Sequence, residues 1–150
     1  MSEKIVNDLL RELGERETLT ISPEKSVGEA ARKMTLWDVG ALVVTDTDGK
    51  VVGIVSERDF RTKVVPHNVD SNVAKVETIM TRKVETVSRN TNLKECEDKM
   101  KDLHIRHLPV VENGELIAVV SIRDLLVSTR EELQSLVRDL KNYISPFSSA

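Results

Sequence analysis

The chain has little of several residue types, and each shortage argues against a class of protein. Aromatic residues make up only 3% of its 150 residues, so it cannot assemble the platform on which single-stranded nucleic acids stack. A net charge of -3 argues against broad binding to nucleic-acid backbones. The single cysteine, Cys96, excludes an internal disulfide framework and fits a reducing compartment.

The chain also lacks long hydrophobic runs. No apolar stretch approaches the ~20 residues that a membrane-spanning helix needs. The N-terminal segment is unlike a signal or transit peptide because it is acidic, at Glu3, Asp8, Glu12 and Glu15. Hydrophobic residues (39%) and charged residues (31%) are balanced as in ordinary folded domains. We therefore expect a soluble cytoplasmic protein with no membrane or nucleic-acid partner.

What the chain does have is an internal repeat. Residues 19–60 and 85–125 follow the same pattern, in which Asp46 aligns with Glu112. The turn that follows is one residue shorter in the second copy. Both copies end in the same Ser-x-Arg-Asp pattern, at Ser56–Asp59 and at Ser121–Asp124. Two copies of this size predict a duplicated unit with pseudo-twofold symmetry.

Each copy reads as β-α-β-β-α. Ser26, followed three residues later by Glu29, has the spacing of a helix N-terminal capping box. Asp48-Gly49 and Asn113-Gly114 are typical of hairpin turns. Three short strands cannot bury both faces of a sheet alone, so the two units should pack sheet to sheet. The expected fold class is α/β (mixed α+β), with two such repeats plus N- and C-terminal helices.

Apolar residues at helical spacing predict the two terminal helices, over 3–13 and 129–144, the second ending at Ser145-Pro146. The predicted division is an N-terminal helix over 1–14, a first repeat over 15–65, a linker over 66–77, a second repeat over 78–128, and a C-terminal helix and tail over 129–150.

Four segments in order resemble a known family: 53–59, 79–81, 105–111 and 119–124. Together with the repeat, residues 15–128 resemble a pair of CBS domains (named after cystathionine β-synthase), the Bateman module, in its standalone two-CBS form. The resemblance implies a non-catalytic sensor of energy or metabolite state that regulates a protein partner and forms a homodimer. It also implies clefts between the repeats that bind AMP, ADP or ATP, with S-adenosylmethionine or NADH as further possibilities.

The repeated Ser-x-x-Asp pattern suits that ligand chemistry. It falls where a strand gives way to a helix, and the N–H groups at a helix N-terminus favour an anion. A carboxylate accepts two hydrogen bonds side by side, which matches the two cis hydroxyls of a ribose. In the family the aspartate has this role. The alternative is that Asp59 and Asp124 only stabilise the first turns of their helices.

The resemblance further implies that each site joins the Ser-x-x-Asp of one repeat to base contacts from the other. Arg106 and His107 would neutralise phosphate in site A, whereas Gly40 and Ala41 offer only space in site B. Site A is therefore expected to be the stronger nucleotide site. Arg58 and Arg123 are expected to face either phosphate or solvent. Site A comprises Ser56, Arg58, Asp59, Thr86, Val87, Ile105, Arg106 and His107, and site B comprises Thr20, Ile21, Val39, Gly40, Ala41, Ser121, Arg123 and Asp124.

Other chemical readings are less favoured. His104 and His107 lie three residues apart, but no second ligand pair follows, so we expect no metal site. Cys96 should be a small core residue, and Trp37 should pack in the core or a dimer contact and not on a ligand. No nucleophile–base pair indicates an enzyme. The alternative function is an interaction module that docks a partner through its terminal helices while the clefts have no ligand.

Overall fold

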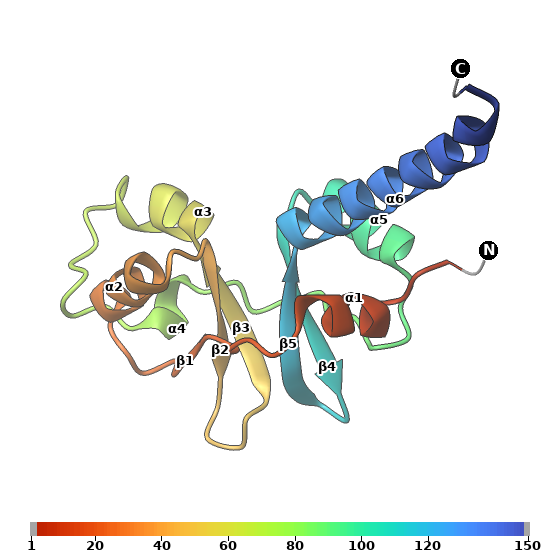
Figure 1. Ribbon diagram of the computed structural model, residues 1–150. Coiled ribbons are helices and arrows are strands. Elements are labelled where there is room, and N and C mark those ends of the chain that lie inside the picture. The colour runs from red at the N-terminus through yellow and green to blue at the C-terminus, as the bar shows by residue number, and fades with distance from the viewer. Residues whose placement is uncertain (1–2, 149–150) are drawn as a thin grey trace.

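The computed structural model describes residues 3–148, which form two halves with their sheets facing each other and helices outside (Figure 1). The first half contains β1 (Thr20–Ile21), α2 (Val27–Trp37), β2 (Ala41–Thr45), β3 (Val51–Ser56), α3 (Glu57–Asp59), the π-helical turn η1 (Phe60–Val64) and α4 (Val76–Ile79). The second half contains α1 (Val6–Leu13), α5 (Leu93–Leu103), β4 (His107–Glu112), β5 (Glu115–Ser121) and α6 (Ile122–Ser148).

The two sheets have corresponding topologies. In the first, β1 pairs in parallel with β2, and β2 pairs antiparallel with β3. In the second, β4 and β5 are antiparallel, and the third strand is reduced to a single parallel bridge between Val87 and Val110. That bridge corresponds to the pairing of Ile21 with Val44 in the first sheet. The predicted mixed fold of two related repeats is confirmed.

Equivalent residues delimit the long helix of each repeat. The side chains of Ser26 and Asn92 each accept a hydrogen bond from the backbone N–H three residues on, at 3.1 and 2.7 Å. At the other end Asp38 and His104 adopt left-handed backbone conformations, with φ of 51° and 54°. Such residues stop a helix by turning the chain out of it. The predicted N-cap at Ser26 is confirmed.

The middle residues of β2 and β4 are buried on both faces of their sheets, as sheet-to-sheet packing requires. Successive residues of a strand point to opposite faces. Leu42 and Val44 of β2 belong to the core beneath the helices, yet Val43 between them is equally buried. Pro109 of β4 is also fully buried. These residues cover the face that each sheet turns toward the other half.

Each short helix precedes one repeat but packs into the core of the other half. Val6 and Leu9 of α1 are buried with α5, β4 and β5, and the N–H of Val6 donates to Thr91 O at 2.8 Å. Val76 of α4 is fully buried in the first core. The predicted division into a separate helix over 1–14 and a linker over 66–77 therefore differs from the cores that the structure shows. Sequence order does not reveal that a helix crosses to the more distant repeat.

The C-terminal helix also differs from its prediction. The closing helix of the second repeat and the predicted helix over 129–144 are one element, α6, which continues past Pro146 to Ser148. A proline costs a helix one backbone hydrogen bond but does not by itself fix where the helix ends. Leu125 and Ser128 are buried, whereas every residue over 129–144 is exposed. The second half of α6 extends away from the body (Figure 1).

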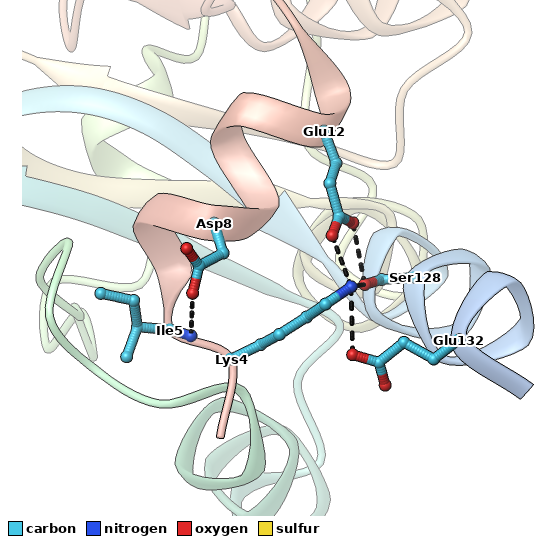
Figure 2. Close-up of polar contacts among 6 residues, drawn as sticks. All are labelled: Lys4, Ile5, Asp8, Glu12, Ser128 and Glu132. Atoms are coloured by element: carbon cyan, nitrogen blue, oxygen red, sulfur yellow. Dashed lines mark hydrogen bonds and ion pairs between the residues drawn. The ribbon is translucent and has the colours of Figure 1, made fainter. Parts of the chain in front are cut away.

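A polar cluster fixes α6 against α1 (Figure 2). The ammonium of Lys4 contacts the carboxylates of Glu12 and Glu132, the latter at 3.0 Å. The hydroxyl of Ser128, which is buried, donates to Glu12 at 3.0 Å. The hydrogen bond with Glu12 is the main cause of a raised pKa at Lys4. The direction in which α6 leaves the body is thus set by the N-terminal helix.

None of the helices in residues 3–148 combines the length and hydropathy needed to cross a membrane.

Candidate functional site

A cleft of about 1090 Å³ lies where the two halves meet. Its walls come from the loop before β2, from the start of β4, and from the junction between β5 and α6. Residues of the segment that connects α1 to β1 also line it; Figure 1 shows this segment passing from the second half to the first. The lining consists of residue 10 and residues 13–19, 38–41, 57, 89, 106–107, 117–119 and 121–124.

Asp124 is the most constrained polar group of the cleft. The N–H of Ser121 donates to Asp124 Oδ2 at 2.8 Å, and the N–H of Asp124 donates to the Ser121 hydroxyl at 3.1 Å. This reciprocal pair is a capping box that starts α6. The carboxylate is held at the positive end of the longest helix, and its side chain is 12% exposed.

Arg16 forms a two-pronged ion pair with Asp124. Its Nη1 and Nη2 atoms donate to Oδ1 and Oδ2 at 3.0 and 2.7 Å, and Nη2 also donates to Val119 O at 2.8 Å. Burial acts to raise the pKa of Asp124, but hydrogen bonds from Arg16 and Ser121 outweigh it and lower that pKa. The carboxylate is therefore ionised at neutral pH and able to accept hydrogen bonds.

Asp59, the equivalent residue of the first repeat, has a different environment. The N–H of Ser56 donates to its Oδ2 at 2.9 Å, while Lys63, one turn further on, contacts Oδ1 at 2.8 Å. Thr81 donates to the same oxygen at 3.4 Å. Asp59 is buried and does not line the cleft.

Arg106 and His107 line the same cleft as Asp124. They were expected beside Asp59 in site A, but the structure places both in the cleft that Asp124 lines. The register of the second hairpin is the reason. His107 pairs with Ser121 across β4 and β5, and the N–H of Ile122 donates to Arg106 O at 2.9 Å.

The other members of predicted site A lie outside this cleft. Val87 is a core residue of the second half, Ile105 packs against that core, and Thr86 is exposed. Ser56 caps the helix that carries Asp59, and Arg58 points outward with an exposed side chain. None of these residues lines the cleft.

Predicted site B is brought together in large part. Val39, Gly40, Ala41, Ser121, Arg123 and Asp124 all line the cleft. Thr20 and Ile21 do not; they border a separate shallow pocket where Lys33 donates to Thr20 O at 2.6 Å.

Gly40 is a point where the two repeats approach closely across the cleft. A Cβ added to it would lie 3.4 Å from His107 Cε1 and 3.6 Å from Glu57 Oε2. Burial lowers the pKa of His107, against the opposing effects of Asp124 and Glu57, so the ring is neutral at pH 7. A neutral imidazole can donate or accept a hydrogen bond but supplies no positive charge.

Positive charge in the cleft comes from arginines. Arg16 pairs with Asp124, and Arg89 pairs with Glu112 at 3.4 Å. Arg106 and Arg123 also line the cleft and have no ion-pair partner among residues 3–148. Guanidinium groups bind phosphate through paired, charge-assisted hydrogen bonds. The cleft thus combines a ribose-compatible carboxylate with two arginines able to take a phosphate.

Sequence reasoning missed Arg16, although a signal for it exists. The alignment that matches Asp46 with Glu112 also matches Arg16 with Arg82. Arg82 does not contact an aspartate; it donates to Glu77 O at 3.2 Å. Both repeats therefore have an arginine at this position, but the two arginines make different contacts.

The remaining candidates have plain structural roles or none. Cys96 is fully buried in the second core, as predicted, and burial raises the pKa of its thiol to about 11. Trp37 was expected to pack in the core or a dimer contact; it is 48% exposed, so it is not a core residue. Within residues 3–148, no three or more His, Cys, Asp or Glu side chains are grouped so that they could hold a metal ion.

Two repeats with facing sheets and a charged cleft between them define a tandem-repeat module. The CBS domain family model matches residues 8–65 and 76–130. The chain belongs to the CBS-domain family.

Relatives and solved structures agree with this assignment. An uncharacterized 17.7 kDa protein of Acidianus ambivalens is 39% identical over 106 residues, which are 70% of this chain and 63% of that protein. The mitochondrial CBS domain-containing protein CBSX3 of Arabidopsis thaliana is 36% identical over 126 residues, 79% of this chain and 61% of the relative. The crystal structure of the CBS domain NE2398 superposes with a TM-score of 0.79 at 37% identity, covering 85% of this chain and 98% of that one. The chain spans less than two thirds of the length of both relatives.

Two solved structures contain adenosine compounds. The CBS domain protein PAE2072 of Pyrobaculum aerophilum, complexed with AMP, has a TM-score of 0.72 at 30% identity, covering 81% of this chain and 89% of that one. The CBS domain pair of protein MJ0100, in complex with methylthioadenosine and S-adenosylmethionine, has a TM-score of 0.76 at 25% identity, covering 87% and 99%.

Proposed function

We propose that this chain is a non-catalytic regulatory module that binds an adenine nucleotide, AMP, ADP or ATP, in the cleft lined by Asp124. The observation that carries the proposal is the carboxylate of Asp124, ionised and held by the capping box at the start of α6. The ribose hydroxyls would donate to it, and Arg106 and Arg123 would bind the phosphate. The adenosine ligands of PAE2072 and of MJ0100 support this choice of ligand class.

The cleft also suits the rest of a nucleotide. Its volume of about 1090 Å³ lies just above the usual range for small-molecule sites, roughly 300–1,000 Å³, so a nucleotide has room in it. Apolar side chains of Leu13, Val39, Ile117 and Ile122 line it and can cover the faces of an adenine ring. The proposed site differs from the stronger site predicted at Asp59, because Arg106 and Arg123, which we propose bind phosphate, line the cleft with Asp124.

A ligand bound next to Asp124 can change the position of the two terminal helices. Asp124 lies in the first turn of α6, and α6 is joined to α1 through Lys4, Glu12 and Glu132 (Figure 2). Arg16 belongs to the segment that follows α1. A ligand that contacts both halves favours the arrangement in which its contacts are best, so it can shift the position of α1 and α6.

A calorimetric titration of AMP into the purified chain tests the proposed function. We expect a saturable exothermic isotherm with one ligand per chain. No heat from AMP, ADP or ATP at millimolar concentration would contradict the proposal.

The exposed half of α6 favours a second role, self-association. Large apolar residues recur along one stripe of this helix at the three- and four-residue steps of a coiled coil. Each is about half exposed or more, and every residue of the helix over 129–144 is exposed. We propose that two copies pair along this stripe to form a homodimer. The stripe comprises Leu126, Leu133, Leu136, Leu140 and Tyr143.

A charge placed in the stripe tests this pairing. We expect the wild type to elute as a dimer in light-scattering chromatography and Leu136→Glu to elute as a monomer, because a carboxylate would be buried in the seam. The matched control is Ser135→Glu, which puts the same charge on the helix away from the stripe and should remain dimeric. A dimer that survives Leu136→Glu would show that another surface joins the copies.

A further inference from the structure

The cleft is lined by charges of both signs, with carboxylates in the majority. Four arginines line it, together with Asp124 and four other carboxylates. None of these four forms an ion pair among the side chains that the structure describes. The remaining ionisable group of the lining is His107, which is neutral at pH 7. The cleft is therefore not a general anion-binding site. The four carboxylates are Glu15, Glu17, Asp38 and Glu57.

Only two of the arginines are available to an anionic ligand. Arg16 and Arg89 are already paired with carboxylates. Arg106 and Arg123 have no ion-pair partner within residues 3–148. Two guanidinium charges balance one phosphate monoester, which carries about −1.5 to −2 at neutral pH. A second or third phosphate would meet no further unpaired cation among the residues that line the cleft.

Glu57 is the carboxylate that lies beside the proposed phosphate position. It begins α3, and its N–H donates to Gly40 O at 3.1 Å. A Cβ added to Gly40 would lie 3.6 Å from Glu57 Oε2 and 3.4 Å from His107 Cε1. The carboxylate of the first repeat therefore approaches the imidazole that follows Arg106 in the second. Burial lowers the pKa of His107, and the negative charges of Asp124 and Glu57 both act against that effect.

The charge of Glu57 acts more strongly on a ligand that carries more charge. Electrostatic repulsion grows with the product of the two charges. Each phosphate after the first adds about one negative charge to the ligand, which the two unpaired arginines cannot balance. Glu57 therefore disfavours ATP more than it disfavours AMP.

We propose that the cleft selects the adenosine monophosphate, so that affinity falls from AMP to ADP to ATP, and that Glu57 is a residue that sets this preference. The inference rests on the proposed function, since it assumes that the phosphate group lies at Arg106 or Arg123. It makes Glu57 a specificity-determining residue that limits the number of phosphates on the ligand.

The second repeat shows that the fold does not require a carboxylate at this position. Ile122 is the repeat counterpart of Glu57, and its N–H makes the equivalent bond, to Arg106 O at 2.9 Å. Glu57→Gln should therefore leave the fold intact while it removes the charge. The matched control is Glu97→Gln, which removes the same charge from an exposed position of α5 that does not line the cleft.

The experiment is a set of calorimetric titrations of AMP, ADP and ATP into wild type, Glu57→Gln and Glu97→Gln. EDTA is present throughout, so that no divalent cation neutralises the phosphates. We expect wild type to bind AMP about tenfold more tightly than ATP, with ADP between them. Glu57→Gln should reduce this ratio about threefold, because one partly screened charge is lost, and Glu97→Gln should leave it unchanged.

The outcomes separate this inference from the proposed function. If wild type binds ATP as tightly as AMP or more tightly, the selectivity is overturned while the nucleotide site stands. If Glu57→Gln does not reduce the ratio, or Glu97→Gln reduces it equally, the role of Glu57 is overturned. If wild type binds none of the three nucleotides, the proposed function fails, and the inference fails with it.

Discussion

Replacing Asp124 with alanine is expected to abolish measurable AMP binding. The proposed ribose loses both of its hydrogen bonds to a charged acceptor, and each such bond contributes about 1.5–3 kcal/mol. The dissociation constant should therefore rise at least ~100-fold. Calorimetric titration of AMP into Asp124→Ala measures the change directly, and the loss of the capping box makes a parallel check of the folded state necessary.

The control for this variant is Asp59→Ala, the same substitution at the equivalent position of the first repeat. Because Asp59 does not line the cleft, AMP affinity should change less than about threefold. The binding free energy would then change by only ~0.5 kcal/mol, as expected for a residue that does not contact the ligand. Circular dichroism melts of both variants establish that each is folded at the titration temperature. The reverse result, with Asp59→Ala losing AMP and Asp124→Ala retaining it, would place the nucleotide at the site predicted from sequence.

The second large effect concerns stability. Leu9 of α1 is among the largest fully buried side chains, and it packs into the core of the second half. Leu9→Ala should lower the free energy of unfolding by about 2–5 kcal/mol, because it removes a buried side chain and leaves a cavity. Urea denaturation followed by circular dichroism measures this as a lower midpoint.

Leu36→Ala is the matched control for that substitution. Leu36 lies on α2 and is 80% exposed, so its truncation should cost no more than about 0.5 kcal/mol. If Leu9→Ala were as mild as Leu36→Ala, α1 would not be part of the core. The predicted separate N-terminal helix would then be the better description.

The duplication explains what could be predicted from sequence. It determines the order of elements in each half, and the capping residues follow from local chemistry. Ser26 and Asn92 start their helices because a short polar side chain can accept the free backbone N–H three residues on. The Ser-x-x-Asp pattern likewise marks the starts of α3 and α6, where Asp59 and Asp124 accept from the serine N–H.

What could not be predicted depends on long-range register. Whether Arg106 and His107 face Asp59 or Asp124 is set by the pairing of His107 with Ser121 in the second hairpin, which brings both to the aspartate of their own repeat. The side on which α1 packs is set by contacts such as that of Val6 with Thr91, which are far apart in the sequence. Neither follows from the local pattern of the chain.

The position of the nucleotide is the central claim, and a crystal structure of the chain grown with AMP tests it most directly. We predict AMP in the cleft between the halves, with both ribose hydroxyls within hydrogen-bond distance of Asp124 and the phosphate on Arg106 or Arg123. A ribose bound to Asp59, or AMP bound away from both aspartates, would contradict the account.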